Sequence, residues 1–88
     1  MEGASIGDRI ELLDLRAESW GALGNMTAAE EDSQAMLALA RSSRRPVLLS
    51  RALTRIAIIE IRSGRARDAV KTADDALAAA RRAKDPAL

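Results

Sequence analysis

Apolar residues recur every three or four positions over two stretches in the first half of the chain. The first stretch holds Ile6, Ile10, Leu13, Ala17, Trp20 and Leu23, and Gly24 follows it. A glycine directly after a helical pattern is typical of a helix C-terminus. The second stretch runs from about Ala28 to Arg41, and Thr27 with Glu30 has capping-box spacing at its start. The pattern therefore predicts two helices joined by a very short loop.

The second half of the chain repeats this arrangement. Pro46 suits the first turn of a third helix, which continues to Arg62 and ends at Ser63-Gly64. A fourth helix spans about residues 66–84 and carries a stripe of small residues, Ala69, Ala73, Ala76 and Ala80. We expect this stripe to pack closely against a neighbouring helix. Short loops make each pair of helices antiparallel, so the sequence predicts an all-α fold of two helical hairpins.

The two halves align when the chain is shifted by 40 residues without a gap. Ten of the 40 pairs that align residues 9–48 with residues 49–88 are identical: Leu13/Leu53, Ala17/Ala57, Gly24/Gly64, Ala29/Ala69, Leu37/Leu77, Ala38/Ala78, Ala40/Ala80, Arg41/Arg81, Pro46/Pro86 and Leu48/Leu88. The identities fall at turns and at apolar positions, where a structural repeat needs them. We therefore predict a duplicated unit, with a flexible tail at residues 1–5, unit 1 at residues 6–46 and unit 2 at residues 47–88. Pro86 is in phase with Pro46, as if a third unit began there.

These units resemble the tetratricopeptide repeat family, in which a Gly at the inter-helix turn is followed by small residues and a closing Pro. Gly64, Ala69, Ala76 and Pro86 match that motif, and the first unit has Gly24, Ala29, Met36 and Pro46 at the same places. The first unit departs from the family in having Arg16-Ala17 where the second has Ile56-Ala57. The resemblance implies a fragment of a right-handed solenoid, of the longer variant found in sensory arms of bacterial multidomain regulators. HEAT and armadillo repeats are the alternative, which the Gly-to-Ala spacing disfavours.

The resemblance also implies a concave groove lined by the first helix of each unit. The matching positions are Glu11, Asp14, Leu15 and Glu18 in unit 1, and Arg51, Thr54, Arg55, Ile58, Ile61 and Arg62 in unit 2. One wall of this groove is acidic and the other is basic.

Two interpretations of the groove charges remain open. In one, Glu11 pairs with Arg51, and Arg55 pairs with Asp14 or Glu18, as structural ion pairs between helices. In the other, the arginines anchor acidic side chains or a C-terminal carboxylate of a partner, as in one half of the carboxylate clamp of chaperone-binding family members. Ile58 and Ile61 are expected on the groove or its flank as an exposed apolar surface. A partner peptide, a second copy of the chain or another repeat would bury it.

The formal net charge of +1 conceals an asymmetry along the chain. Residues 1–40 hold two basic and eight acidic side chains, a balance of −6, whereas residues 41–88 hold twelve basic and five acidic ones, a balance of +7. Such a split is typical either of a protein that binds an acidic partner or of a fold whose two halves pair their opposite charges with each other. The carboxylates of Glu30-Glu31-Asp32 are expected on a solvated helix face.

Composition narrows the function classes. The chain contains no His and no Cys, which removes the usual nucleophilic, acid–base and metal-binding side chains, so we expect no enzyme, no cofactor and no metal site. No signal peptide or apolar run of membrane-spanning length is present, and a cytoplasmic location is expected by default. The resemblance to tetratricopeptide repeats implies a protein-binding scaffold module, as a segment of a larger bacterial regulatory or signalling protein or as a self-associating domain. The alternative is a nucleic-acid-associated helical domain that binds phosphates through the arginines between Arg41 and Arg67.

Overall fold

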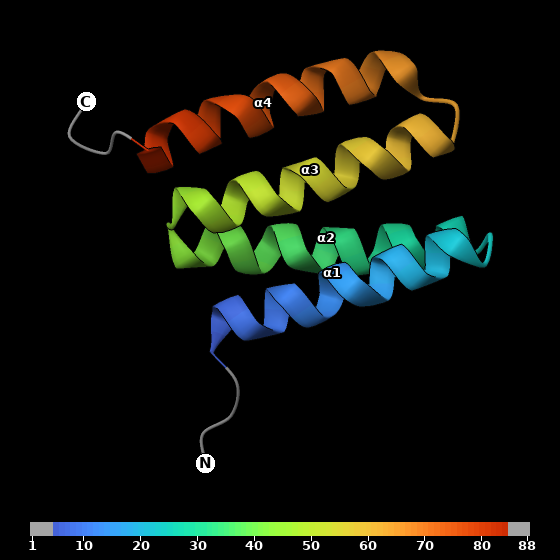
Figure 1. Cartoon of the computed structure of the whole chain (residues 1–88), viewed down its shortest axis with the longest axis horizontal. Coiled ribbons are helices and arrows are strands. Elements are labelled where there is room, and N and C mark those ends of the chain that lie inside the picture. The colour runs from blue at the N-terminus through green and yellow to red at the C-terminus, as the bar shows by residue number, and fades with distance from the viewer. Residues whose placement is uncertain (1–4, 85–88) are drawn as a thin grey trace.

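A computed structural model describes residues 5–84, and within this range the chain forms four α-helices and no strand. Figure 1 shows them side by side in chain order. They are α1 (Ile6–Ala22), α2 (Met26–Ser43), α3 (Pro46–Arg62) and α4 (Ala66–Lys84). The predicted all-α class and the pairing into hairpins are confirmed. The right-handed solenoid stays a prediction.

Glycine makes the turn inside each hairpin. Gly24 has φ +83° and Gly64 has φ +80°, a left-handed conformation that residues with a Cβ adopt only at a cost. The turns are three residues long, at positions 23–25 and 63–65. The connection between the hairpins is shorter still, because Arg44 itself takes a left-handed conformation at the C-terminus of α2 and Pro46 opens α3 directly afterwards. These tight turns force neighbouring helices to run antiparallel.

Two expectations at the helix ends need correction. The N-cap of α2 is Asn25, whose Oδ1 accepts a hydrogen bond from the Ala28 amide, so Thr27 lies inside the helix and forms no capping box. Ser5 caps α1 by accepting from the Asp8 amide, and it therefore belongs to the fold rather than to a flexible tail. The remainder of the predicted tail and the predicted start of a third unit at Pro86 lie outside the described residues.

The helices form a slab of 39 × 38 × 15 Å. Helix α3 packs against α1, α2 and α4, whereas α4 packs against α3 alone among the described helices. The main apolar cluster joins α1, α2 and α3 and consists of Ile10, Met36, Leu37, Ala40, Leu48, Ala52 and Ile56. A smaller cluster of Ala17, Ala29 and Ile59 lies nearer the hairpin turns, and Trp20 and Met26 cover it. The centre of the slab is thus built around one face of α3.

The alanine stripe of α4 faces α3 with a register different from the predicted one. Ala69, Ala76 and Ala79 are buried, whereas Ala73 and Ala80 are exposed. Ala79 takes the place expected for Ala80, and one residue along a helix corresponds to a rotation of about 100° around its axis. Periodicity alone cannot distinguish these two stripes, because alanine occupies almost every position in this part of the helix.

Ala76→Leu should lower the free energy of unfolding by about 1–3 kcal/mol, because the larger side chain overpacks the contact between α3 and α4. Ala78→Leu is the matched control, since Ala78 is exposed on the same helix and a larger side chain there extends into solvent. Thermal and urea unfolding followed by circular dichroism would measure both. Equal stability of the two variants would contradict burial of Ala76.

Candidate functional site: the groove between α1 and α3

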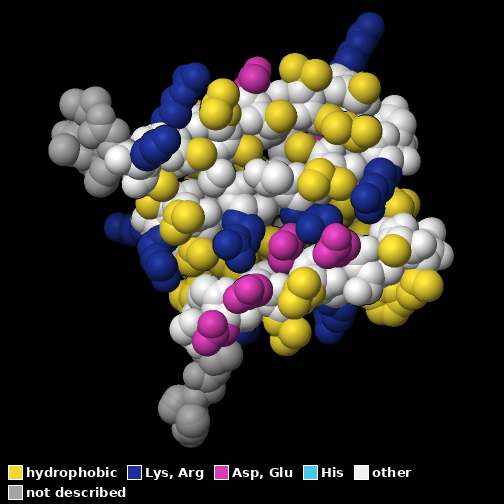
Figure 2. Space-filling view, viewed as in Figure 1, with side chains coloured by type: hydrophobic (Ala, Val, Ile, Leu, Met, Phe, Trp, Pro, Cys, Tyr) yellow, Lys and Arg dark blue, Asp and Glu magenta, His cyan; other side chains and the backbone are white. Residues whose placement is uncertain are grey.

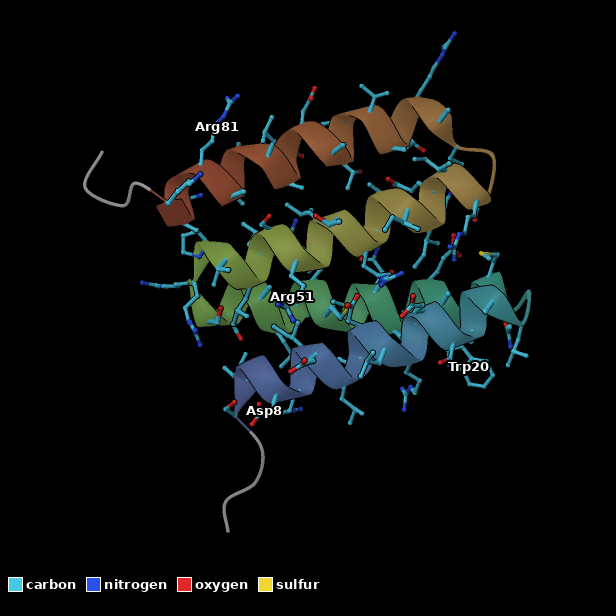
Figure 3. The ribbon with its side chains drawn as sticks, viewed as in Figure 1. Asp8, Trp20, Arg51 and Arg81 are labelled. Atoms are coloured by element: carbon cyan, nitrogen blue, oxygen red, sulfur yellow. The ribbon has the colours of Figure 1, made fainter. Side chains whose placement is uncertain are left out.

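A hollow of about 280 Å³ opens between α1 and α3. It is lined by Asp14, Val47, Ser50, Arg51, Thr54, Arg55 and Ile58. Five of the residues predicted for a partner-binding groove therefore line one depression. Arg51 lies on the face of α3 turned to the viewer in Figure 3, between α3 and α1.

The helical repeat of α3 explains how its residues reach the hollow. The six lining residues from Val47 to Ile58 are spaced by one or three positions in turn, which places them on one face of the helix. The Thr54 hydroxyl donates to the Ser50 carbonyl at 2.8 Å, so this hydroxyl is already engaged within the helix. The hollow offers a partner one guanidinium, aliphatic side chains and few free hydrogen-bond donors.

Arg55 is committed to a contact between helices. Its Nε lies 2.7 Å from Oδ1 of Asp14, and the two side chains are 12% and 24% exposed. Such a charge-assisted hydrogen bond between partly buried groups is stronger than an exposed ion pair. The prediction that Arg55 pairs with an acidic residue of the first helix is confirmed for Asp14, and this arginine is structural.

Arg51 differs from Arg55 in having no such partner. It is exposed and forms no ion pair with any residue of 5–84, and the predicted Glu11–Arg51 pair is absent. Glu11 and Glu18 are exposed on α1 outside the hollow. Figure 2 shows the resulting pattern, a row of acidic side chains along α1 beside basic side chains of α3. Arg51 is thus the cation that this hollow presents to solvent.

Ile61 and Arg62, the last two residues predicted for the groove, lie beyond the hollow, toward the C-terminus of α3. Ile61 is 63% exposed. The guanidinium of Arg62 lies over Gly21, where an added Cβ would come within 2.9 Å of Arg62 Nη1. A residue with a Cβ at position 21 would make the end of the flexible Arg62 side chain shift.

No protein-family model, curated protein or solved structure matches this chain. Within the described range, no helix has the length and apolar character to cross a membrane, and no three acidic side chains gather in a metal-binding group. The residues of the hollow and their contacts therefore carry the functional argument.

Sequence reasoning missed the strongest polar contact, which ties α1 to α2. Arg16 donates to Asp32 through Nε at 2.8 Å and through Nη2 at 2.7 Å, a bidentate arrangement. Asp32 is only 6% exposed, so its assignment to a solvated face was wrong. Glu30 is also engaged, by Arg65, which leaves Glu31 as the exposed member of the acidic run. One signal could have placed Asp32 inward. It lies four residues before the apolar Met36, and residues four apart share one face of a helix.

The surroundings of Asp32 perturb its titration. Hydrogen bonds from Arg16 hold the pKa of the Asp32 carboxyl below its ordinary value, against the opposing effect of burial, and a hydrogen bond from Trp20 adds to the lowering. The ionised form is therefore favoured in the folded protein. A lowered folded-state pKa adds stability above the unfolded-state pKa and loses it as the pH falls through the folded-state pKa.

Four arginines surround a second hollow, of about 300 Å³, at the N-terminal end of α3. Its lining consists of Ala40, Arg41, Arg44, Arg45, Pro46, Leu49 and Arg82, with no acidic residue among them. Arg41 and Arg82 lie in the last turns of α2 and α4, where basic side chains also offset the helix dipole. The sequence prediction of a basic region from Arg41 to Arg67 included two arginines, Arg55 and Arg65, that the structure engages in ion pairs.

Asp32→Asn should lower the free energy of unfolding at neutral pH by about 1–3 kcal/mol, because the variant removes one charged partner of a hydrogen-bonded pair at a buried site. The difference in unfolding free energy between wild type and variant should narrow as the pH falls below about 4, because the carboxyl of the unfolded wild type begins to be protonated there while that of the folded protein is still ionised. Urea unfolding across the pH range measures the difference. Glu31→Gln is the control, and it should leave stability unchanged. If the difference in unfolding free energy between wild type and Asp32→Asn stays the same in acid, the charge of Asp32 is not the cause of that difference.

Proposed function

We propose that this chain is a protein-binding helical module that holds an acidic peptide segment in the groove between α1 and α3. The observation that carries the proposal is the hollow around Arg51, whose guanidinium pairs with no carboxylate of residues 5–84 and stands beside exposed aliphatic side chains. Arg55 is not available to bind the ligand, because its guanidinium already forms an ion pair with Asp14. The resemblance to tetratricopeptide repeats supports the same class of function, and on that basis we further propose that the module serves within a larger bacterial regulatory or signalling protein.

The chemistry of the hollow defines the segment it suits. Val47 is 50% exposed at one end of the lining, and Ile58 is half-buried at the other. Because Arg51 is exposed, its ion pair with a ligand carboxylate would contribute at most about 1 kcal/mol, and charge reversal at this position would add repulsion. Aliphatic residues on either side of that carboxylate would cover Val47 and Ile58. The module therefore prefers an acidic residue flanked by aliphatic ones over a purely acidic run.

Arg51→Glu should weaken binding of short labelled peptides that carry Glu between Leu and Val residues by at least about tenfold. Fluorescence anisotropy measures the affinity, and the same peptides with Gln in place of Glu show how much of it is due to charge. Arg9→Glu is the control, because Arg9 is an exposed arginine on α1 outside the hollow. The Arg51 variant is preferable to a change at Arg55, which would also break a structural ion pair. Equal affinity of the Arg51→Glu and Arg9→Glu proteins would overturn the proposal.

The second candidate function is phosphate-mediated binding of nucleic acid at the arginine-lined hollow. It is favoured by one observation, that Arg41, Arg44, Arg45 and Arg82 surround a depression without an acidic residue. Replacing Arg41 and Arg45 together by Ala should then reduce the slope of log affinity against log salt concentration by about two, because each arginine neutralises about one phosphate. Filter binding of labelled DNA and RNA at several salt concentrations measures this slope. Weak binding with an unchanged slope would count against this candidate.

A further inference from the structure

Helix α4 carries an exposed apolar stripe on the flank beside its contact with α3. The stripe consists of Val70, Ala73, Leu77 and Ala80, at spacings of three and four residues, and all of them are exposed. Val70 is 64% exposed and Leu77 is 50% exposed. Figure 2 shows apolar side chains along the α4 edge of the molecule, at the top of the view. None of the described helices packs on this side of α4.

The duplicated unit shows what occupies the same face one repeat earlier. The 40-residue shift places the stripe on Glu30, Ser33, Leu37 and Ala40 of α2. Helix α3 covers this face: Leu37 and Ala40 belong to the cluster that contains Leu48, Ala52 and Ile56, and Glu30 and Ser33 share a hollow with Ile56 and Ile59. The face of α2 is therefore buried by an antiparallel helix with apolar residues four positions apart. The face of α4 is more apolar, because Val70 and Ala73 replace Glu30 and Ser33.

A second copy of this chain fits the α4 stripe poorly through α1. The residues of α3 that pack on α2 are Leu48, Ala52 and Ile56, and their equivalents in α1 are Asp8, Leu12 and Arg16. Two charged residues thus interrupt the apolar row that the contact needs. Asp8 is exposed at the start of α1 (Figure 3), so it would carry its charge into such a contact.

A second copy also fits poorly through its own α4. Arg67, Asp74 and Arg81 recur every seven residues along the outer edge of the stripe, and Arg81 points away from the slab in Figure 3. An antiparallel pair of α4 helices would bring Arg67 opposite Arg81 and Asp74 opposite its own copy. A parallel pair would instead gather the basic last turns, which hold Arg81, Arg82 and Lys84. Like charges meet in either direction.

We propose that the Val70-Ala73-Leu77-Ala80 stripe is the docking site for an amphipathic helix of a partner protein that lies antiparallel to α4. The partner's apolar residues recur at four-residue spacing with a small residue in the middle, as Leu48, Ala52 and Ile56 of α3 do where they pack on α2. Its flanks carry acidic side chains opposite Arg67 and Arg81 and a basic one opposite Asp74. The two alanines of the stripe let the backbones approach closely, and the two larger residues fill the gaps between the partner's side chains.

The test uses the whole chain and a synthetic helix. The probe is a labelled peptide with the Leu-Ala-Ile row of α3 at four-residue spacing and Glu at the two outer flanking positions. We expect Leu77→Lys and Val70→Lys each to weaken its binding by at least about tenfold, because each inserts a charge into the apolar contact. Leu12→Lys is the matched control, since this side chain is 65% exposed on α1. Circular dichroism of each variant establishes that it is folded. A probe with Lys in place of both Glu residues should bind more weakly.

Three results would overturn the inference. One is a probe that does not bind the wild-type chain or binds the Leu77→Lys protein with unchanged affinity. Another is a dimer, seen by light scattering, that Leu77→Lys dissociates, because the occupant would then be a second copy. The third is disappearance of probe binding in the Arg51→Glu protein, which would place the helix in the groove instead. Because the stripe and the groove lie on different helices, failure of one proposal leaves the other standing.

Discussion

Close approach between helices is the constraint on which this structure depends. Eight of the fourteen buried apolar side chains among the described residues are alanine. A buried alanine removes little apolar surface from water, so it stabilises mainly by letting two backbones come near enough for dense contact. That explains how a slab only 15 Å thick acquires a core without phenylalanine or tyrosine. Five of the six larger buried apolar residues of this range gather in one cluster around α3, namely Ile10, Met36, Leu37, Leu48 and Ile56.

Because the core is thin, polar pairs also help to hold the helices in their relative positions. Arg16 with Asp32 joins α1 to α2, Arg55 with Asp14 joins α3 to α1, and Arg65 with Glu30 joins the second hairpin turn to α2. Each pair takes its acid from the first 40 residues. Two of the three arginines come from the second half. Two of these pairs therefore match an acidic residue of the first half with an arginine of the second half, whereas most basic side chains of the second half, Arg51 among them, form no such pair within residues 5–84.

The helices and turns were predictable because their signals are local. Periodicity located all four helices of residues 5–84 to within two residues at each end, and Gly24 and Gly64 marked the turns. The polar pairs were not predictable in the same way, since Arg16 and Asp32 come together only through the crossing of α1 and α2. The register of α4 was missed for a related reason: when Ala73, Ala76, Ala79 and Ala80 are all present, only the position of α3 decides which are buried. Five of the predicted groove residues line one hollow, because four of them share one face of α3, whereas Glu11, Glu18, Ile61 and Arg62 lie outside it.

Helix α3 is the element that connects the core to both proposed binding surfaces. One of its faces closes the core against α2, another receives the alanines of α4, and the third lines the groove with Arg51 and Ile58. A ligand in the groove would therefore contact the same helix that fixes the position of α4, and with it the stripe around Leu77. Because α4 packs on no other described helix, any shift of α3 carries that stripe along. The two surfaces are separate in chemistry but share one support, so occupancy of one would be felt at the other only through the packing of α3.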